Sequence, residues 1–325
     1  MLKFNNSTFE IILSYANIYI FIIPHSIFHK FFSIYGKIKV DFDEGSGHMS
    51  KAYFIEGIPG SGKTTYAKRL YDHFKAKGES VELYNEGDLH PIDLAWCSII
   101  KTDTFNKLTE KHSVYRDQIL SHSKFIEDIV ITAYTKVEVD DKDVSFFDDL
   151  SHYEIYRTKD FSHFRDTHLT LWETFNQTHK KDTTYIFECI YLQNHINELK
   201  LKFSLSETDM IDYFQDLMDK LSKFETTILY IKPLNIKATF DKVIEERKSN
   251  NKNYKDWIDQ VIEYLEGTKL GKKLGYVGYD GALKYFIDRQ KLECDLLRNL
   301  TTKKVIFEQK EDYDIVFNMI INYLE

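Results

Sequence analysis

Cysteine and proline are scarce in this chain, which has three cysteines and four prolines among 325 residues. Cys97, Cys189 and Cys294 lie far apart and form no C-x-x-C pair. This spacing argues against both a disulfide framework and a zinc site. Because free cysteines suit a reducing compartment, we expect a cytoplasmic protein.

An excess of basic charge is also missing. The chain has 43 Lys and Arg against 51 Asp and Glu, a formal net charge of −8, and the two signs are interleaved. No basic face or tail therefore indicates binding to a nucleic-acid backbone, whereas a small anionic substrate held locally is compatible with this balance. The length allows one to three domains, of which we favour one domain with insertions.

The apolar stretch near the N-terminus is short. Residues 11–23 are apolar over only 13 positions, fewer than the roughly 17 to 25 that span a bilayer, and no A-x-A-like cleavage site follows them. We expect residues 1–48 to be an extension outside a folded domain of residues 49–325. Three alternatives stay open: Met49 is the natural start, Gly-Ser-Gly-His-Met is a cloning scar, or the segment is a membrane or interfacial anchor.

Strand-like and helical patterns alternate from residue 51 onward, which predicts an α/β fold with a parallel sheet. The runs read as strands are residues 53–55, 80–84, 184–190, 226–231 and 303–307. We expect three layers, with a five-stranded parallel sheet between helices on both faces. Residues from about 92 to 182 intervene between the second and third strands, and their patterns over 92–100, 102–111 and 115–134 predict a helical insertion.

A glycine-rich loop follows the first predicted strand and fits the phosphate-binding pattern G-x-x-x-x-G-K-[ST]. Glycines let backbone N–H groups turn toward an anion, and the next helix presents its positive end. Lys63 would reach the β and γ phosphates of ATP, and Thr64 would bind Mg²⁺. The alternative, a chance glycine turn, leaves the flanking strand and helix unexplained. The expected nucleotide-binding residues are Gly57, Gly60, Ser61, Gly62, Lys63, Thr64 and Thr65.

Three further charged residues are candidates for catalysis. Asp88 follows the second predicted strand, where a carboxylate could take the proton of an acceptor hydroxyl; alternatively, Asp88 and Glu86 only cap or turn the chain. Glu188 ends an apolar strand and could bind Mg²⁺ through water or hold the substrate; alternatively, a backbone group or a lysine satisfies it. Arg247 lies in a lid-like region, about residues 236–266, and could stabilise transferring phosphate; alternatively, it belongs to a solvated helix face.

The other arginines and the histidines carry weaker expectations. Any of Arg157, Arg165 and Arg289 could bind an anionic substrate. His90, His168 and His195 have no ligand spacing with Cys or Asp partners, so we do not expect a metal site among them.

GIPGSGKTT at residues 57–65 resembles the loop of P-loop kinases of the nucleoside-monophosphate-kinase-like group, which includes shikimate kinase, gluconate kinase and antibiotic phosphotransferases. GDLHP at residues 87–91 resembles the G-D-x-L-H-P stretch of gluconate kinases with one residue missing. The resemblance implies a P-loop NTPase fold, a substrate contact for Asp88 and a lid near residues 236–266. The chain lacks an arginine-rich lid and has a long insertion, which leaves the acceptor undetermined. It also resembles uncharacterised bacterial P-loop proteins.

Together these residues predict an ATP- and Mg²⁺-dependent kinase for a hydroxyl of a small molecule, such as a sugar, a nucleoside or an antibiotic. ATP is favoured over GTP because no N-K-x-D motif is visible near the fourth predicted strand. The alternatives are a nucleotide-dependent switch with slow hydrolysis, whose insertion binds a protein, and a kinase of nucleotides or RNA ends. The oligomeric state is left open.

Overall fold

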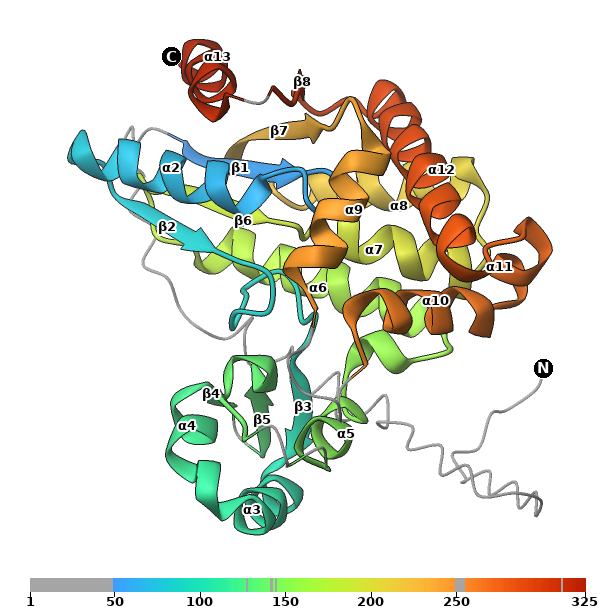
Figure 1. Cartoon of the computed structure of the whole chain (residues 1–325). Helices are drawn as coiled ribbons and strands as arrows, with labels where there is room; N and C mark the ends of the chain where they lie inside the picture. Colours follow the sequence, from blue (N-terminus) through green and yellow to red (C-terminus); the bar gives the residue numbers. More distant parts are fainter. Residues whose placement is uncertain (1–48, 127, 141–142, 144, 249–254, 311) are drawn as a thin grey trace, which may run out of the picture.

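The computed structural model describes residues 49–126, 128–140, 143, 145–248, 255–310 and 312–325 (Figure 1). The expectations for residues 1–48 lie outside these ranges. Across the described ranges, no helix combines the length and the apolar character that crossing a membrane requires.

A five-stranded, wholly parallel sheet forms the centre of the protein, as predicted. Its strands are β1 (Ser50–Glu56), β2 (Val81–Tyr84), β6 (Thr184–Glu188), β7 (Phe224–Lys232) and β8 (Lys304–Glu308). They lie in the order β2-β6-β1-β7-β8. The first strand of the chain is therefore central, and its neighbours β6 and β7 come from much later in the sequence.

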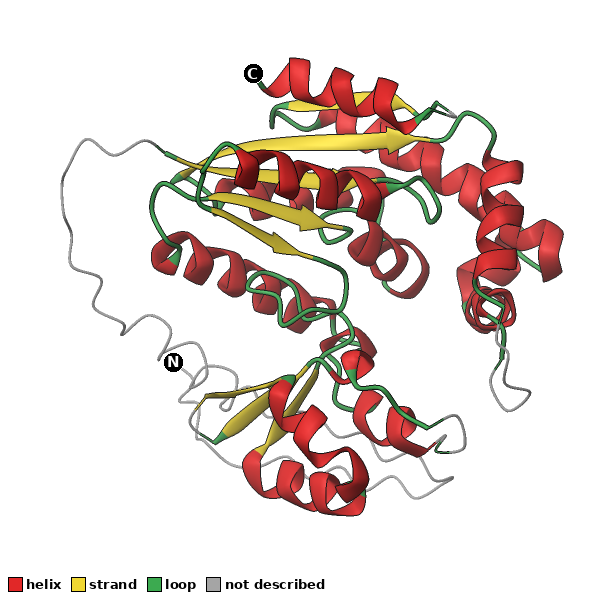
Figure 2. Ribbon diagram, turned by 60° about the vertical axis from the view of Figure 1, so that its left-hand side comes forward, coloured by secondary structure: helices red, strands yellow, loops and turns green. Residues whose placement is uncertain are grey.

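Helices cover both faces of this sheet (Figure 2). Side chains alternate along β1, so that Tyr53 and Ile55 pack with α2 (Lys63–Ala76) and α13 (Tyr313–Leu324) on one face. Ala52 and Phe54 point to the opposite face. That face packs against α6 (Phe161–Thr178), α8 (Glu207–Asp219) and α12 (Gly278–Asn299). The period of two along a buried strand thus produces the three predicted layers.

The insertion contains strands, so the prediction of a purely helical insertion was wrong. A separate antiparallel sheet has the order β3-β5-β4. Its strands are β3 (Ser98–Lys101), β4 (Ser123–Ile126) and β5 (Ile129–Thr132), next to helices α3 (Thr102–Lys111), α4 (Arg116–Ser121) and α5 (Ser145–Ser151). These strands are four residues long, too short to show a period, and their β-branched residues favour strand pairing. The sheet and its helices share a small core and form a lobe beside the main sheet (Figure 2).

A second lobe, which consists of helices, packs at the carboxyl end of the main sheet. It contains α9 (Ile236–Glu246), α10 (Trp257–Gly267) and α11 (Lys269–Leu274). Its core joins Phe240, Leu265 and Phe286 to Ile58 of the glycine loop. The remaining short elements are η1 (Ser113–Tyr115), η2 (Tyr134–Lys136), η3 (Ile155–Arg157), α7 (Gln193–Asn197) and the π-turn η4 (Glu198–Lys202). The predicted lid-like region thus contains two helices that pack near the loop, with residues 249–254 outside the description.

Candidate functional site

The candidate site lies where the connections of two neighbouring strands diverge. After β1 the chain continues through α2 on one face of the sheet, whereas after β6 it continues through α7 and α8, and α8 packs on the opposite face. In open parallel sheets, such a divergence leaves a crevice at the carboxyl ends of the strands, and ligands bind there. The loop of residues 57–62 and Glu188 lie at this position.

Three glycines set the shape of the loop. Gly57, Gly60 and Gly62 have φ angles of 144°, 81° and 88°, which favour glycine. A Cβ atom on Gly57 would also lie 2.4 Å from the carbonyl oxygen of Ile231. Helix α2 begins directly after Gly62, with no side-chain cap and no acidic residue in its first turn. Its positive end is therefore available to an anion.

The side chains of the loop differ in burial and in hydrogen bonding. Lys63 is almost fully buried, and its Nζ donates to the carbonyl oxygen of Ile58, 3.0 Å away, across the loop. The Oγ atom of Ser61 is buried and has no hydrogen-bond partner. Thr64 and Thr65 are exposed at the start of α2. The loop thus has a cationic group and an unused hydroxyl beside the helix end.

The structure brings together the two residues predicted to bind Mg²⁺. The Thr64 hydroxyl donates to Oε1 of Glu188 over 2.9 Å. Glu188 is 4% exposed, and its Oε2 accepts from the backbone N–H of Glu86. The Cys189 thiol donates to Oε1, and the left-handed backbone of Cys189, with φ of 71°, turns the chain after β6. A hydroxyl beside a carboxylate offers the oxygen ligands that Mg²⁺ prefers.

Glu56, the last residue of β1, is a site residue that the sequence reasoning missed. It is fully buried, and its two oxygens accept from the backbone N–H groups of Tyr191, at 2.7 Å, and Gln193, at 3.2 Å. Burial raises the pKa of Glu56 to about 8, although these N–H groups and Lys63 act in the opposite direction. An acidic residue at the end of an otherwise apolar strand was the available signal.

Asp88, in the loop after β2, is held in place from two sides. Its Oδ2 accepts from the backbone N–H of Asn85 over 2.7 Å, and its Oδ1 lies 3.0 Å from Nζ of Lys136. The first contact forms a turn, as the structural alternative for Asp88 predicted. The second contact links the carboxylate to the insertion. The structure therefore places Asp88 near the insertion with both oxygens engaged.

Trp96 was not singled out from the sequence, yet it contacts the loop after β2. Its Nε1 donates to Glu86 over 3.1 Å. Its side chain is 41% exposed, and its φ of 59° is one that large residues rarely adopt. The backbone N–H of Glu86 donates to Glu188, so Glu86 connects Trp96 to the candidate metal ligands.

Arg247 lies at the C-terminal end of α9, and α9 packs directly on the glycine loop. A Cβ atom on Gly60 would lie 2.3 Å from Cγ2 of Val243, one turn before Arg247. The Arg247 guanidinium is exposed and lies 5.2 Å from the ring centre of Trp257. The three other candidate arginines have protein partners, namely Ser151 for Arg157, Asp216 for Arg165 and Glu293 for Arg289.

The spacing of the histidines predicted no metal site, but the structure brings two of them together with Asp93. His90 is not in the group that the other two histidines form with Asp93, and its Nδ1 accepts from the backbone N–H of Ile92. His168 and His195 instead meet Asp93, so that possible ligand atoms of the three residues all lie within 4.8 Å of one another. No sequence signal marked this group, because its members are 75 and 27 residues apart.

The fold and the site define a parallel α/β protein with a glycine-rich loop and a hydroxyl–carboxylate pair. Both lie where the connections after β1 and β6 diverge. No protein-family model matches the chain.

Proposed function

We propose that this protein is a P-loop kinase that transfers a phosphoryl group from ATP, with Mg²⁺, to a hydroxyl of a small molecule. The observation that carries the proposal is the contact between the Thr64 hydroxyl and Glu188, directly after a glycine loop at the point where the central connections diverge. This arrangement supports binding of a metal–nucleotide complex at that point.

The residues of the loop fit the phosphates of ATP. The positive φ angles of Gly60 and Gly62 and the uncapped start of α2 suit an anion, and the unpartnered Ser61 hydroxyl offers it a donor. Lys63 would exchange the Ile58 carbonyl for a phosphate oxygen, while Thr64 and Glu188 would hold the metal. ATP supplies the transferable phosphoryl group, and Mg²⁺ neutralises its charge.

The acceptor would bind between the loop after β2 and the insertion. Asp88 is the carboxylate that we assign as the general base, and it would exchange its contact with Lys136 for the acceptor hydroxyl. Trp96 exposes its ring beside the loop after β2, which suits an acceptor with a flat or ring-shaped surface. Arg247, on the helix that packs over the loop, would stabilise the transferring group.

One observation favours the second candidate, a nucleotide-dependent switch with slow hydrolysis. Both oxygens of Asp88 already have partners, and one of these is Lys136. In a switch, this ion pair would connect the nucleotide site to the insertion, and the insertion would bind a protein.

The deciding experiment measures ATP turnover by the full chain with Mg²⁺, alone and with pools of sugars, nucleosides, nucleotides and antibiotics. The kinase proposal predicts stimulation by one pool and a phosphorylated product. It also predicts that Asp88→Asn slows transfer by about 100-fold or more while ATP affinity is kept. Asp72→Asn, an exposed residue of α2, is the control. Tight ATP binding with slow turnover that no pool stimulates would favour the switch.

A further inference from the structure

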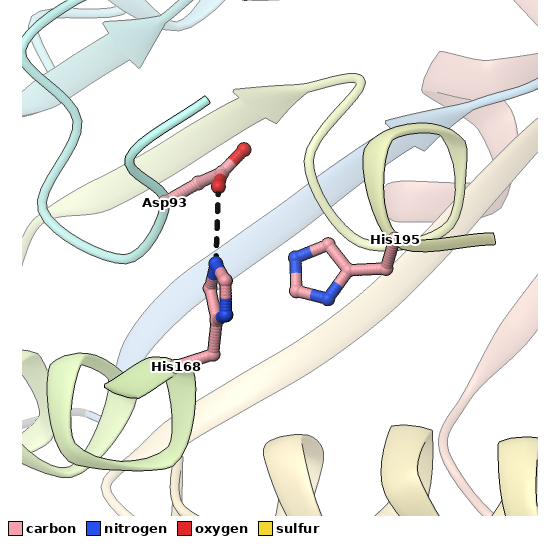
Figure 3. A group of neighbouring side chains, drawn as sticks. All are labelled: Asp93, His168 and His195. Atoms are coloured by element: carbon pink, nitrogen blue, oxygen red, sulfur yellow. Dashed lines mark ion pairs between the residues drawn. The ribbon is translucent and has the colours of Figure 1, made fainter. Parts of the chain in front are cut away.

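Asp93, His168 and His195 form a buried group of three side chains (Figure 3). Asp93 comes from the chain between β2 and β3, His168 from α6 and His195 from α7. Asp93 is 2% exposed and both histidines are fully buried. His168 Nε2 lies 3.4 Å from Oδ1 of Asp93, and the ring centres of the histidines are 4.5 Å apart.

Partners outside the group orient both imidazole rings. His168 Nδ1 lies 2.8 Å from the carbonyl oxygen of Phe164, and because a carbonyl only accepts, this nitrogen carries a proton. His195 Nδ1 lies 2.6 Å from the hydroxyl of Tyr213. The Nε2 atoms of both histidines are buried and have no hydrogen-bond partner. Histidine ligands of metals are held in this way, with one nitrogen bound to an oxygen and the other facing the ion.

Asp93 is held in place by three donors. Its Oδ1 accepts from the Tyr156 hydroxyl and from the backbone N–H of Ala95, and its Oδ2 accepts from the side chain of Asn194. These donors favour the ionised carboxylate. His168 Nε2 faces this carboxylate across 3.4 Å, a position that a proton or a metal ion between the two groups can fill.

We propose that Asp93, His168 and His195 bind one divalent transition-metal ion with the preferences of Zn²⁺. Two imidazole nitrogens and one carboxylate oxygen suit zinc and its neighbours, whereas Mg²⁺ and Ca²⁺ prefer oxygen ligands only. Bonds of about 2.0 to 2.2 Å would place the ligand atoms roughly 3.4 Å apart in a tetrahedral site. Binding would therefore draw the three side chains closer than their present separations of up to 4.8 Å.

The ion would fix the segment after β2 to helices α6 and α7. Asn194, which donates to Asp93, is adjacent to Gln193, whose side chain donates to Glu86 and whose backbone donates to Glu56. A metal bound to Asp93 and His195 would thus tie the loop after β2 to the segment after β6. We assign the ion a structural role, which does not depend on the kinase proposal.

The test measures the metal content of the full chain after purification without chelating resin, by mass spectrometry of the elements. The expected result is about one equivalent of zinc per chain. Asp93→Asn, His168→Gln and His195→Gln should each lower the content at least fivefold. His90→Gln, a buried histidine with an unpartnered Nε2 outside the group, should keep it.

A second measurement covers variants that do not fold. A strong chelator should lower the thermal unfolding midpoint of the unmodified chain, and Zn²⁺, but not Mg²⁺, should restore it. Absence of metal in the purified chain, together with no change in the unfolding midpoint on adding Zn²⁺, would overturn the proposal. A proton shared by Asp93 and His168 would then explain their contact. Unchanged metal content in folded His168→Gln and His195→Gln would also overturn it. Neither readout uses ATP turnover, so a failed kinase test leaves the metal proposal standing.

Discussion

The proposed nucleotide side and the proposed acceptor side of the candidate site are built in different ways. The nucleotide side consists of one contiguous loop, residues 57–65, together with Glu188, which the neighbouring strand brings within hydrogen-bond distance of Thr64. The proposed acceptor side joins Asp88, in the loop after β2, to Lys136 of the insertion, while Arg247 comes from α9, which packs on the glycine loop. The first arrangement depends mostly on the local geometry of one loop, whereas the second depends on how the insertion packs against the loop after β2. Substitutions on the two sides should therefore have different consequences.

Loss of the Lys63 ammonium should give the largest effect, because Lys63 is the only basic residue in residues 57–65. We expect Lys63→Ala to lower turnover by about 100-fold or more and to weaken ATP binding. Steady-state turnover and an ATP titration measure the two effects. Lys68→Ala removes an exposed lysine from the same helix and is the control. Turnover within threefold of the unmodified protein would show that the loop does not serve ATP.

Glu188→Gln should give the next largest effect and tests whether the partner of Thr64 holds the metal. The amide keeps the volume and one acceptor oxygen but removes the charge, so the Mg²⁺ concentration for half-maximal turnover should rise by roughly 10- to 100-fold. A Mg²⁺ titration at saturating ATP measures it. Glu82→Gln, on β2 and paired with Lys180, is the control. An unchanged Mg²⁺ requirement would reduce Glu188 to a structural partner of Thr64.

The same contrast explains which features the sequence could predict. The positions of the five strands and the glycine loop follow from apolar runs and a local motif, and each of these depends on residues close together in the chain. The strands of the insertion could not be predicted, because short runs such as residues 98–101 become strands only through pairing with a distant segment. The burial of Glu56, the ion pair of Asp88 and the meeting of Asp93 with two histidines likewise depend on long-range packing.

Glu56 ends β1 directly before the glycine loop, and its effect should appear as a pH dependence of stability. Its pKa is raised from 4.5 in the unfolded chain to about 8 in the folded protein. Between these values the folded state keeps a proton that the unfolded state loses. Its contribution to stability is therefore complete below pH 4.5 and falls as the pH rises toward 8.

We expect Glu56→Gln to remove this fall, which is at most about 1.4 kcal/mol per pH unit. Urea unfolding of the variant and the unmodified chain at pH 5, 6, 7 and 8 measures the difference in slope. Glu225→Gln, an exposed residue of β7, should keep the original slope. Parallel curves for Glu56→Gln and the unmodified chain would mean that Glu56 is ionised in the folded protein.

Arg247 should show the smallest effect and decides whether α9 belongs to the chemistry. Arg247→Ala should lower phosphoryl transfer roughly fivefold, the size expected from one partly exposed charge, with ATP affinity within twofold. Because the guanidinium is exposed over Trp257, the free energy of unfolding should change by less than about 1 kcal/mol. Arg298→Ala, an exposed residue of α12 paired with Asp295, is the control. Equal turnover in both variants would assign Arg247 to a solvated helix end and would leave the proposed site without a residue from the lid-like region.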